Sequence, residues 1–311
     1  MSTMCERYRG ALLGLACGDA IGTSVEFSPR GSFVELTDMV GGGPFNLKAG
    51  QWTDDTSMAL CLAESLLTKD GFDASDQMNR YRNWLEWGYL SSTGSCFDIG
   101  MTVRDALQRF GMTGEPYSGS ADPRSAGNGS LMRLAPVVLF AHPDWDKVQR
   151  LAADSSRTTH GAAEAVEACQ LFAEILSLAL DGVAKESLLG SLRFVAHQGK
   201  IADIASGHFI EKAKSDIHGT GYCVASLEAS LWSFFNTASF EAAVLCAANL
   251  GDDADTTAAI TGQIAGAYYG VQAIRSDWLA KLTMREEIDT MAQQLYQRFN
   301  PNGDAFAKLD R

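Results

Sequence analysis

An all-α fold is what this 311-residue sequence predicts. Apolar side chains recur with helical spacing along most of the chain, as at positions 240, 243, 244, 247 and 248, which follow the stripe of an amphipathic helix. Strand-like alternation with β-branched residues is restricted to Ser32–Thr37. Neither a Pro/Ser-rich linker nor a repeat of fixed period divides the chain. We therefore expect a single domain spanning residues 1–311.

The helices themselves are bounded by turn residues such as Asp181-Gly182 and Asn300-Pro301. We predict them at residues 6–20, 57–69, 75–89, 102–110, 130–141, 146–155, 161–180, 184–196, 200–214, 222–235, 240–248, 256–273 and 284–299. The stretches 10–18 and 258–267 are rich in glycine and alanine. Each interior glycine costs a helix roughly 1 kcal/mol relative to alanine, a cost that close helix packing can offset. Both stretches are predicted to be central helices, and both run beside acidic motifs.

Composition excludes several functional classes. The net charge is −13 and no cluster of Lys and Arg stands out, so a duplex nucleic acid would be repelled. No uncharged apolar run reaches 18 residues, which argues against a membrane span. Asp19 interrupts the apolar stretch near the N-terminus, so we expect a cytoplasmic protein without a signal peptide. The seven cysteines are scattered and never spaced as C-x-x-C, which predicts small core residues rather than disulfides or a zinc site.

Two acidic motifs stand at predicted helix starts. Residues 53–56 read Thr-Asp-Asp-Thr, and residues 252–256 read Asp-Asp-Ala-Asp-Thr. Either motif alone is compatible with simple helix capping, since Thr and Asp accept the free N–H groups of a first turn. One carboxylate is enough for a cap, however, and each motif carries more. Carboxylates and Thr hydroxyls are ligands that Mg²⁺ and Mn²⁺ prefer, and the two motifs together would suffice for a pair of ions if they converge.

Further residues suggest a substrate next to such ions. The loop Gly127–Ser130 precedes an apolar helix and can present backbone N–H groups to a phosphate, although Gly-Asn-Gly is also a common turn. His160 stands just before another helix, where it can donate to a phosphate or a ribose hydroxyl or simply end the loop. Glu26 lies between Val25 and Phe27, an apolar setting that raises a carboxyl pKa. Asp98 precedes a predicted helix. Each of these, taken alone, is more often structural.

Taken together and in order, these segments resemble the motifs of the ADP-ribosylglycohydrolases, especially the branch of dinitrogenase reductase-activating glycohydrolase. The matching pieces are residues 10–22 with Glu26, then 53–56, 98–100, 127–129, 156–160, 221–222 and 253–256. The resemblance implies one orthogonal all-α domain with two divalent cations, Mg²⁺ or Mn²⁺, in a central metal cleft. The metal ligands that it implies are Thr53, Asp54, Asp55, Asp253, Asp255 and Thr256. It also implies that the diphosphate is bound by Gly127, Asn128, Gly129, Ser130 and His160, with Tyr222 near the adenosine.

The same resemblance implies a function. Glu26 and Asp98 would be the catalytic residues in hydrolysis of the N-glycosidic bond between ADP-ribose and a modified side chain, arginine first of all. Two alternatives remain: hydrolysis of another ADP-ribosyl conjugate, serine-linked or a small molecule, and a non-enzymatic binding or immunity protein directed against an ADP-ribosyltransferase. The expected partner is an ADP-ribosylated protein or small molecule, and the expected state is a monomer. The chain departs from the branch at Met101, where Asn is frequent, and at Asp252, where Gly is usual.

Overall fold

The computed structural model describes residues 2–299 and confirms the all-α fold as a single helical domain. Residues 1 and 300–311 of the expected domain lie outside the described residues. Between residues 2 and 299, β-type pairing amounts to three isolated β-bridges. The helices are α1 (Met4–Gly22), α2 (Asp54–Lys69), α3 (Ala74–Trp87), α4 (Met101–Thr113), α5 (Ala135–Ala141), α6 (Trp145–Arg157), α7 (Ala163–Leu180), α8 (Gly199–Ala205), α9 (Cys223–Phe235), α10 (Phe240–Ala248), α11 (Ala254–Tyr269), α12 (Ser276–Lys281) and α13 (Arg285–Phe299).

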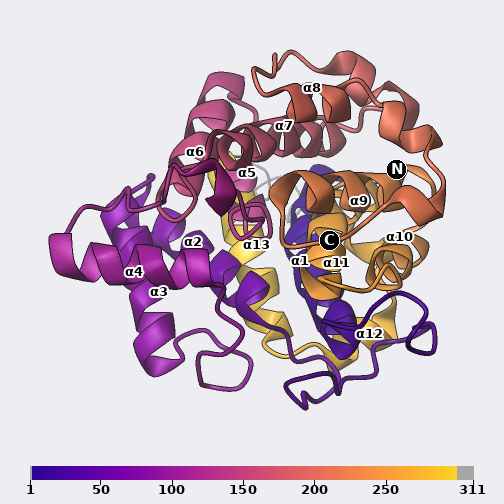
Figure 1. Ribbon diagram of the computed structural model, residues 1–311, viewed down its shortest axis with the longest axis horizontal. Coiled ribbons are helices and arrows are strands. Elements are labelled where there is room, and N and C mark those ends of the chain that lie inside the picture. Colours follow the sequence, from indigo (N-terminus) through magenta and orange to yellow (C-terminus); the bar gives the residue numbers. More distant parts are fainter. Residues whose placement is uncertain (1, 300–311) are drawn as a thin grey trace, which may run out of the picture.

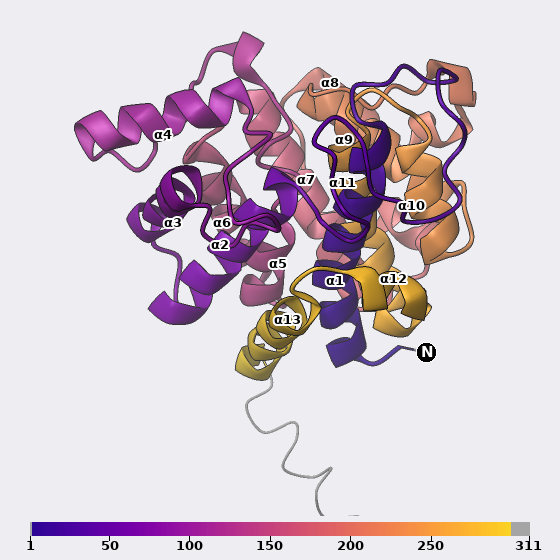
Figure 2. The same cartoon turned by 90° about the horizontal axis from the view of Figure 1, so that it is seen from below.

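Helices α1 and α11 lie side by side at the centre of the molecule, as Figures 1 and 2 show. Their glycines are the reason that they can approach so closely. A Cβ atom on Gly14 would lie 2.3 Å from the carbonyl oxygen of Gly262, and one on Gly18 would lie 2.1 Å from that of Ala258. The predicted role of the two small-residue stretches is confirmed. Because α1 ends beside the start of α11, the contact also brings Asp19 next to the acidic motif of α11.

The other helices cover this central pair. Helices α9 and α10 pack on α11, α7 contacts both α9 and α11, and α13 packs along α1. Helices α3 and α4 lie at one edge of the molecule, and α2 connects them to the centre (Figure 1). The first residues of α2, α4 and α11 line one common cavity. The fold therefore turns three helix N-termini toward the same space.

One predicted helix is absent, and the one strand-like stretch of the sequence forms no strand. Residues 184–196 form no α-helix but two short 3-10 turns and an irregular segment, because carboxylates on α7 accept its backbone N–H groups: Glu174 binds those of Arg193 at 2.6 Å and Phe194 at 2.8 Å. Residues 32–37 form no strand. The backbone of Leu36 pairs instead with the side-chain amide of Asn249, at 2.7 and 2.9 Å, which takes the place of a partner strand.

Smaller differences concern helix ends. The helix predicted at 200–214 ends at Ala205 and continues as 3-10 turns, and the one predicted at 256–273 ends at Tyr269, before Gly270 with its φ of +81°. Helix α12 has no counterpart among the predictions. The seven cysteines all lie among the described residues and form no disulfide, and each is buried or half-buried, as expected. Among the described residues, no helix combines the length and the apolar character that crossing a membrane requires.

Candidate active site

Helix α2 begins with a cap supplied by another helix. Asp19, buried on α1, accepts four hydrogen bonds through its two carboxylate oxygens. Oδ1 accepts the N–H and the hydroxyl of Thr53, both at 2.9 Å, and Oδ2 accepts the N–H of Thr56 at 3.0 Å and its hydroxyl at 2.6 Å. Thr53 itself makes no side-chain cap. Because Asp19 satisfies the first turn, the carboxylates of Asp54 and Asp55 are not needed for capping.

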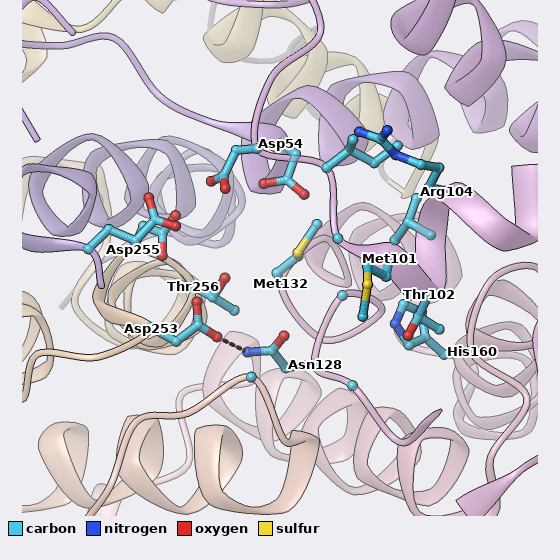
Figure 3. Close-up of a pocket in the computed structure, with 18 of the residues that line it drawn as sticks. Asp54, Met101, Thr102, Arg104, Asn128, Met132, His160, Asp253, Asp255 and Thr256 are labelled. Atoms are coloured by element: carbon cyan, nitrogen blue, oxygen red, sulfur yellow. Dashed lines mark hydrogen bonds between the residues drawn. The ribbon is translucent and has the colours of Figure 1, made fainter. Parts of the chain in front are cut away.

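The two predicted acidic motifs converge. The Thr53 hydroxyl lies 3.4 Å from Oδ2 of Asp255, and the Thr256 hydroxyl lies 3.4 Å from Oδ2 of Asp55. Each helix start therefore contacts the other through one threonine and one aspartate. Asp54 is also buried and points into the cavity beside them (Figure 3). The convergence that the sequence could only suggest is a property of the fold.

Asp255 joins two groups of carboxylates. Its oxygens lie within 4.8 Å of oxygens from Asp19 and Asp55 on one side, and within 4.8 Å of oxygens from Glu26 and Asp98 on the other. The carboxylates of four other residues are thus gathered around Asp255. Neighbouring negative charges at this distance repel strongly in a medium of low dielectric constant, so the cluster is stable only if protons or cations neutralise it.

The chemistry of the donors fits divalent cations. Oδ1 of Asp55, Oδ1 of Asp255 and Oε2 of Glu26 are buried and have no hydrogen-bond partner among the described residues. A buried polar atom left without a partner costs roughly 1–3 kcal/mol, and a charged one costs more. Hard cations such as Mg²⁺ and Mn²⁺ bind carboxylate and hydroxyl oxygens of this kind. The clustered acidic residues can therefore hold metal.

The electrostatics of the cluster follow from burial and repulsion. Burial, and then the charges of neighbouring aspartates and Glu26, hold the pKa values of Asp54, Asp55 and Asp255 well above their ordinary range. Burial raises the pKa of Glu26 to about 9, with Asp98 adding to the shift. The pKa of Asp98 is raised to about 7, again mainly by burial. In the absence of metal cations, the carboxyl groups of the cluster therefore bind protons, which reduce their mutual repulsion.

A cavity of about 640 Å³ opens above these carboxylates. Figure 3 shows Asp54, Asp253 and Asp255 on one side of it and His160 on the other, with Asn128 between them. The loop residues Gly127, Asn128 and Gly129 line it, and so do Glu26, Asp98 and Thr256. Volumes of 300–1,000 Å³ are usual for sites that bind small molecules and cofactors. Most of the residues singled out in the sequence therefore share one cavity.

The glycine loop is tied to the acidic cluster. Asn128 donates through its side-chain amide to Oδ2 of Asp253 at 2.6 Å, while its backbone N–H binds the carbonyl of Gly221. Gly127 and Gly129 make room for His160: a Cβ atom on Gly129 would lie 2.8 Å from Cε1 of the imidazole. Burial lowers the pKa of His160 to about 3, with the charge of Arg133 contributing. The imidazole is therefore neutral and can donate through one nitrogen only.

Two predicted substrate residues lie outside the cavity lining. The Ser130 hydroxyl accepts from the hydroxyl of Ser156 at 2.9 Å and from the thiol of Cys169 at 3.3 Å, so it is directed into the core. Tyr222 donates its hydroxyl to Glu164 and accepts from Lys200 at 2.8 Å. Thr53 and Asp55 also do not line the cavity, but they lie directly beneath Asp255. The backbone of Ser130 remains in the loop that does line it.

Several site residues were missed. In the sequence, Asp19 stands out only as a charge that interrupts an apolar stretch. Its place at the end of a glycine-rich helix beside an acidic motif could have indicated a site residue. Phe27 and Phe45 line the cavity, as does the start of α4 from Gly100 to Arg104. The structure also locates the two positions at which the chain departs from the family pattern. Met101 is 82% exposed near the cavity mouth, and the backbone of Asp252 has a φ of +57°. Glycine adopts such a φ without strain, which accounts for its being usual at position 252.

Comparison with known proteins identifies the family of the chain. A family model described as ADP-ribosylglycohydrolase matches residues 1–305. The chain is 45% identical over 294 residues to the ADP-ribosylarginine hydrolase Tri1 of Pseudomonas putida (strain GB-1), an alignment that covers 94% of this chain and 78% of that protein. It is 34% identical to the ADP-ribosyl-[dinitrogen reductase] glycohydrolase of Rhodospirillum rubrum, with 93% and 94% covered.

Solved structures give the same result. A chain of an ADP-ribosylglycohydrolase-related protein complex superimposes with a TM-score of 0.84 at 45% identity, covering 96% of this chain and 99% of that one. The match spans nearly the whole fold, including the helices that carry the acidic cluster. With a family model that matches almost the entire length and relatives well above 30% identity, the chain belongs to the ADP-ribosylglycohydrolase family.

Proposed function

We propose that this protein hydrolyses the N-glycosidic bond between ADP-ribose and arginine with the help of two divalent cations, Mg²⁺ or Mn²⁺. The observation that carries the proposal is the position of Asp255 in two carboxylate groups at once, one with Asp19 and Asp55 and one with Glu26 and Asp98. The names of the relatives at 43–45% identity, both ADP-ribosylarginine hydrolases, support arginine as the linked residue.

The metal ligands in this proposal come from the two helix starts. Asp54, Asp55 and Thr53 would bind from α2, and Asp253, Asp255 and Thr256 from α11. Asp19 acts as a positioning residue, because it holds the first turn of α2 through Thr53 and Thr56. The partnerless oxygens of Asp55 and Asp255 support direct coordination. When bound, the cations supply positive charge that orients the ribose hydroxyls and polarises the sugar.

Proton transfer falls to the carboxyl groups outside the helix starts. Glu26 and Asp98 both have carboxylate oxygens beside Asp255, and in the metal-free site burial raises the pKa of each. Water adds its oxygen to the anomeric carbon as the bond from that carbon to the guanidine nitrogen breaks. The proton released by the water passes through Glu26 or Asp98 to the departing guanidine. The products are free ADP-ribose and arginine.

The rest of the ligand would extend across the cavity. The diphosphate would lie at the loop Gly127–Ser130, where the N–H groups of Gly127 and Asn128 are already bonded within the protein and those of Gly129 and Ser130 remain. Neutral His160 would donate one hydrogen bond beside them. Tyr222 would contribute at the adenosine end after exchanging its bonds to Glu164 and Lys200.

The test compares substrates and metals directly. Peptides carrying ADP-ribose on arginine or on serine are incubated with the protein in Mg²⁺, in Mn²⁺ and in chelator, and free ADP-ribose is measured. We expect release from arginine that disappears in chelator and in Asp55→Asn and Asp255→Asn. Asp252→Asn is the matched control, since it makes the same change in the same loop as Asp253 without touching the cavity lining, and it should keep full activity. Release that survives chelation, or that is restricted to serine, contradicts the proposal.

A further inference from the structure

Three phenylalanine rings contact one another in a row beside the cavity. The ring of Phe27 contacts that of Phe45 edge to face, with centroids 6.4 Å apart, and Phe45 contacts Phe97 at 5.2 Å. Phe27 and Phe45 lie in the connection between α1 and α2, and Phe97 lies in the one between α3 and α4. Phe27 and Phe45 both line the cavity, and Phe27 is 66% exposed. We call these three rings the aromatic rim.

The rim is joined to the carboxyl groups by the chain itself. Phe27 directly follows Glu26, and Phe97 directly precedes Asp98. The carboxylate oxygens of Glu26 and Asp98 lie within 4.8 Å of Asp255. Each end of the rim is therefore one residue away from an acidic group that faces the reaction centre.

The backbone holds Phe27 in place at some cost. Phe27 has a φ of +60°, a conformation that non-glycine residues rarely adopt. Its N–H donates to the carbonyl of Asp252 at 2.7 Å, and the N–H of Asp252 donates to the carbonyl of Ser28 at 2.9 Å. These two bonds tie the Phe27 turn to the loop that carries Asp253. An exposed phenyl ring in a strained conformation, fixed to the metal-ligand loop, has no evident packing function.

Phe45 is fixed independently. It lies in a tight turn closed by reciprocal backbone bonds between Gly42 and Leu47, at 2.7 and 2.9 Å. This turn rests on the segment before Glu26, since a Cβ atom on Gly43 would lie 2.1 Å from the carbonyl of Thr23. The rim is thus organised before any ligand binds, and its spacing from Glu26 is set by the backbone.

Charge decides which ligand suits this rim. The cavity is lined by Glu26, Asp54, Asp98, Asp253 and Asp255. Among residues 2–299, Arg104 is the one lining side chain with a permanent positive charge. A planar guanidinium is attracted to carboxylates at its edge and to aromatic rings at its face. We propose that the aromatic rim is the subsite that holds the guanidinium of the substrate and so selects arginine-linked ADP-ribose. The inference rests on the proposed function and specifies its leaving-group site.

The first test removes ring faces while keeping apolar bulk. Phe27→Leu and Phe45→Leu are each assayed with an arginine-linked ADP-ribosyl peptide. A cation–π contact corresponds to a change of about threefold to thirtyfold in affinity, so we expect KM to rise by that factor while kcat stays within about twofold. The affinity for free ADP-ribose, measured by calorimetry, should not change, because ADP-ribose carries no guanidinium. Phe27→Trp, which keeps an aromatic face, should retain the native KM.

The controls separate the rim from the rest of the site. Trp87→Leu changes another aromatic side chain, 75% exposed at the end of α3 and outside the cavity lining, and should have no effect. A native KM in both leucine variants overturns the rim proposal, as does an equal loss of ADP-ribose affinity. Failure of the native protein to release ADP-ribose from arginine contradicts the proposed function instead. In that case inhibition by agmatine, compared between native protein and Phe27→Leu on whatever conjugate is cleaved, still decides whether the rim binds a guanidinium.

Discussion

The Oδ2 atom of Asp19 lies 2.6 Å from the hydroxyl of Thr56 and 3.0 Å from its backbone nitrogen. A residue near the end of α1 thereby caps the start of α2, a helix that begins 35 residues later in the chain. This bond frees the two aspartates at the start of α2 for other partners. It also fixes α2 relative to α1, and through the contact of α1 with α11 it fixes the distance between the two acidic motifs.

Asp19→Asn should therefore destabilise the protein. An amide can accept with one oxygen only and would turn its NH₂ group toward two of the four donors of Thr53 and Thr56. We expect a loss of about 2–4 kcal/mol in the free energy of unfolding, measured by urea unfolding in chelator. Asp73→Asn is the matched control, because Asp73 caps α3 from within its own loop through one bond at 3.0 Å, and it should cost at most about 1 kcal/mol. Equal stabilities of the two variants would contradict the cross-helix cap.

The glycine contact between α1 and α11 predicts a second effect. Gly18→Ala places a methyl group 2.1 Å from the carbonyl oxygen of Ala258, and backbone on both sides prevents it from moving away. We expect more than about 3 kcal/mol of destabilisation and weaker metal binding, because the helices must separate. Gly190→Ala adds the same methyl group where no atom lies within 4 Å. Thermal unfolding of both variants provides the comparison, and a native melting temperature for Gly18→Ala would refute the close approach.

Divalent cations should stabilise the folded protein. The cluster around Asp255 contains buried oxygens without partners, so a cation that binds only the folded state adds stability by mass action. At a hundredfold excess over its dissociation constant, Mg²⁺ or Mn²⁺ should add about 2.7 kcal/mol, or roughly 3–6 °C in the melting temperature of a chain of this length. The shift should vanish in Asp255→Asn and persist in Asp252→Asn. An identical shift in both variants would place the cation elsewhere.

Without metal, stability should fall as the pH rises. The pKa values of Asp98 and Glu26 are raised to about 7 and about 9 in the folded state, from ordinary values near 4. A carboxyl group with a raised pKa binds its proton more tightly when folded, so its contribution is complete below pH 4 and is lost as the pH rises through about 7 and then about 9. Urea unfolding in chelator at pH 5.5, 7 and 8.5 should show this decline, on the order of 1 kcal/mol per pH unit.

Glu26→Gln is the matched variant for that experiment. The amide does not titrate, so the share of the decline due to Glu26, which extends from about pH 4 to about pH 9, should disappear. The shares of Asp98 and of the buried aspartates remain, so the decline should become shallower. Saturating Mg²⁺ should also flatten the decline, because the cation replaces the protons that the cluster would otherwise bind. Stability in chelator that rises between pH 5.5 and 8.5 would mean that the cluster is already neutralised by other groups.

Local patterns were sufficient for much of the fold. The apolar stripe at 240–248 predicted α10 to the residue, and the small-residue stretches predicted the central pair α1 and α11. Local sequence patterns were not sufficient where a side chain distant in the sequence forms hydrogen bonds with the backbone. Glu174 accepts the N–H groups of Arg193 and Phe194, which therefore form no helical hydrogen bonds. The side-chain amide of Asn249 pairs with the backbone of Leu36, where a neighbouring strand would otherwise pair. A carboxylate or an amide from elsewhere in the chain competes with hydrogen bonds between neighbouring residues. The sequence around the affected backbone gives no sign of this competition.

The acidic residues of the candidate active site show the same difference between what local sequence predicts and what tertiary structure decides. The sequence by itself determined that two helix starts carry more carboxylates than capping uses, that a glycine loop and a histidine follow, and that their order resembles one family. Only the tertiary structure decided that Asp255 meets Asp55 and Glu26, and that Asp19 supplies the cap. Tertiary structure also brought Phe97 next to Phe45 and Phe27, which lie in a different connection. The physical reason is that helical periodicity acts over a few residues, whereas the meeting of side chains far apart in the chain depends on how closely α1 and α11 pack.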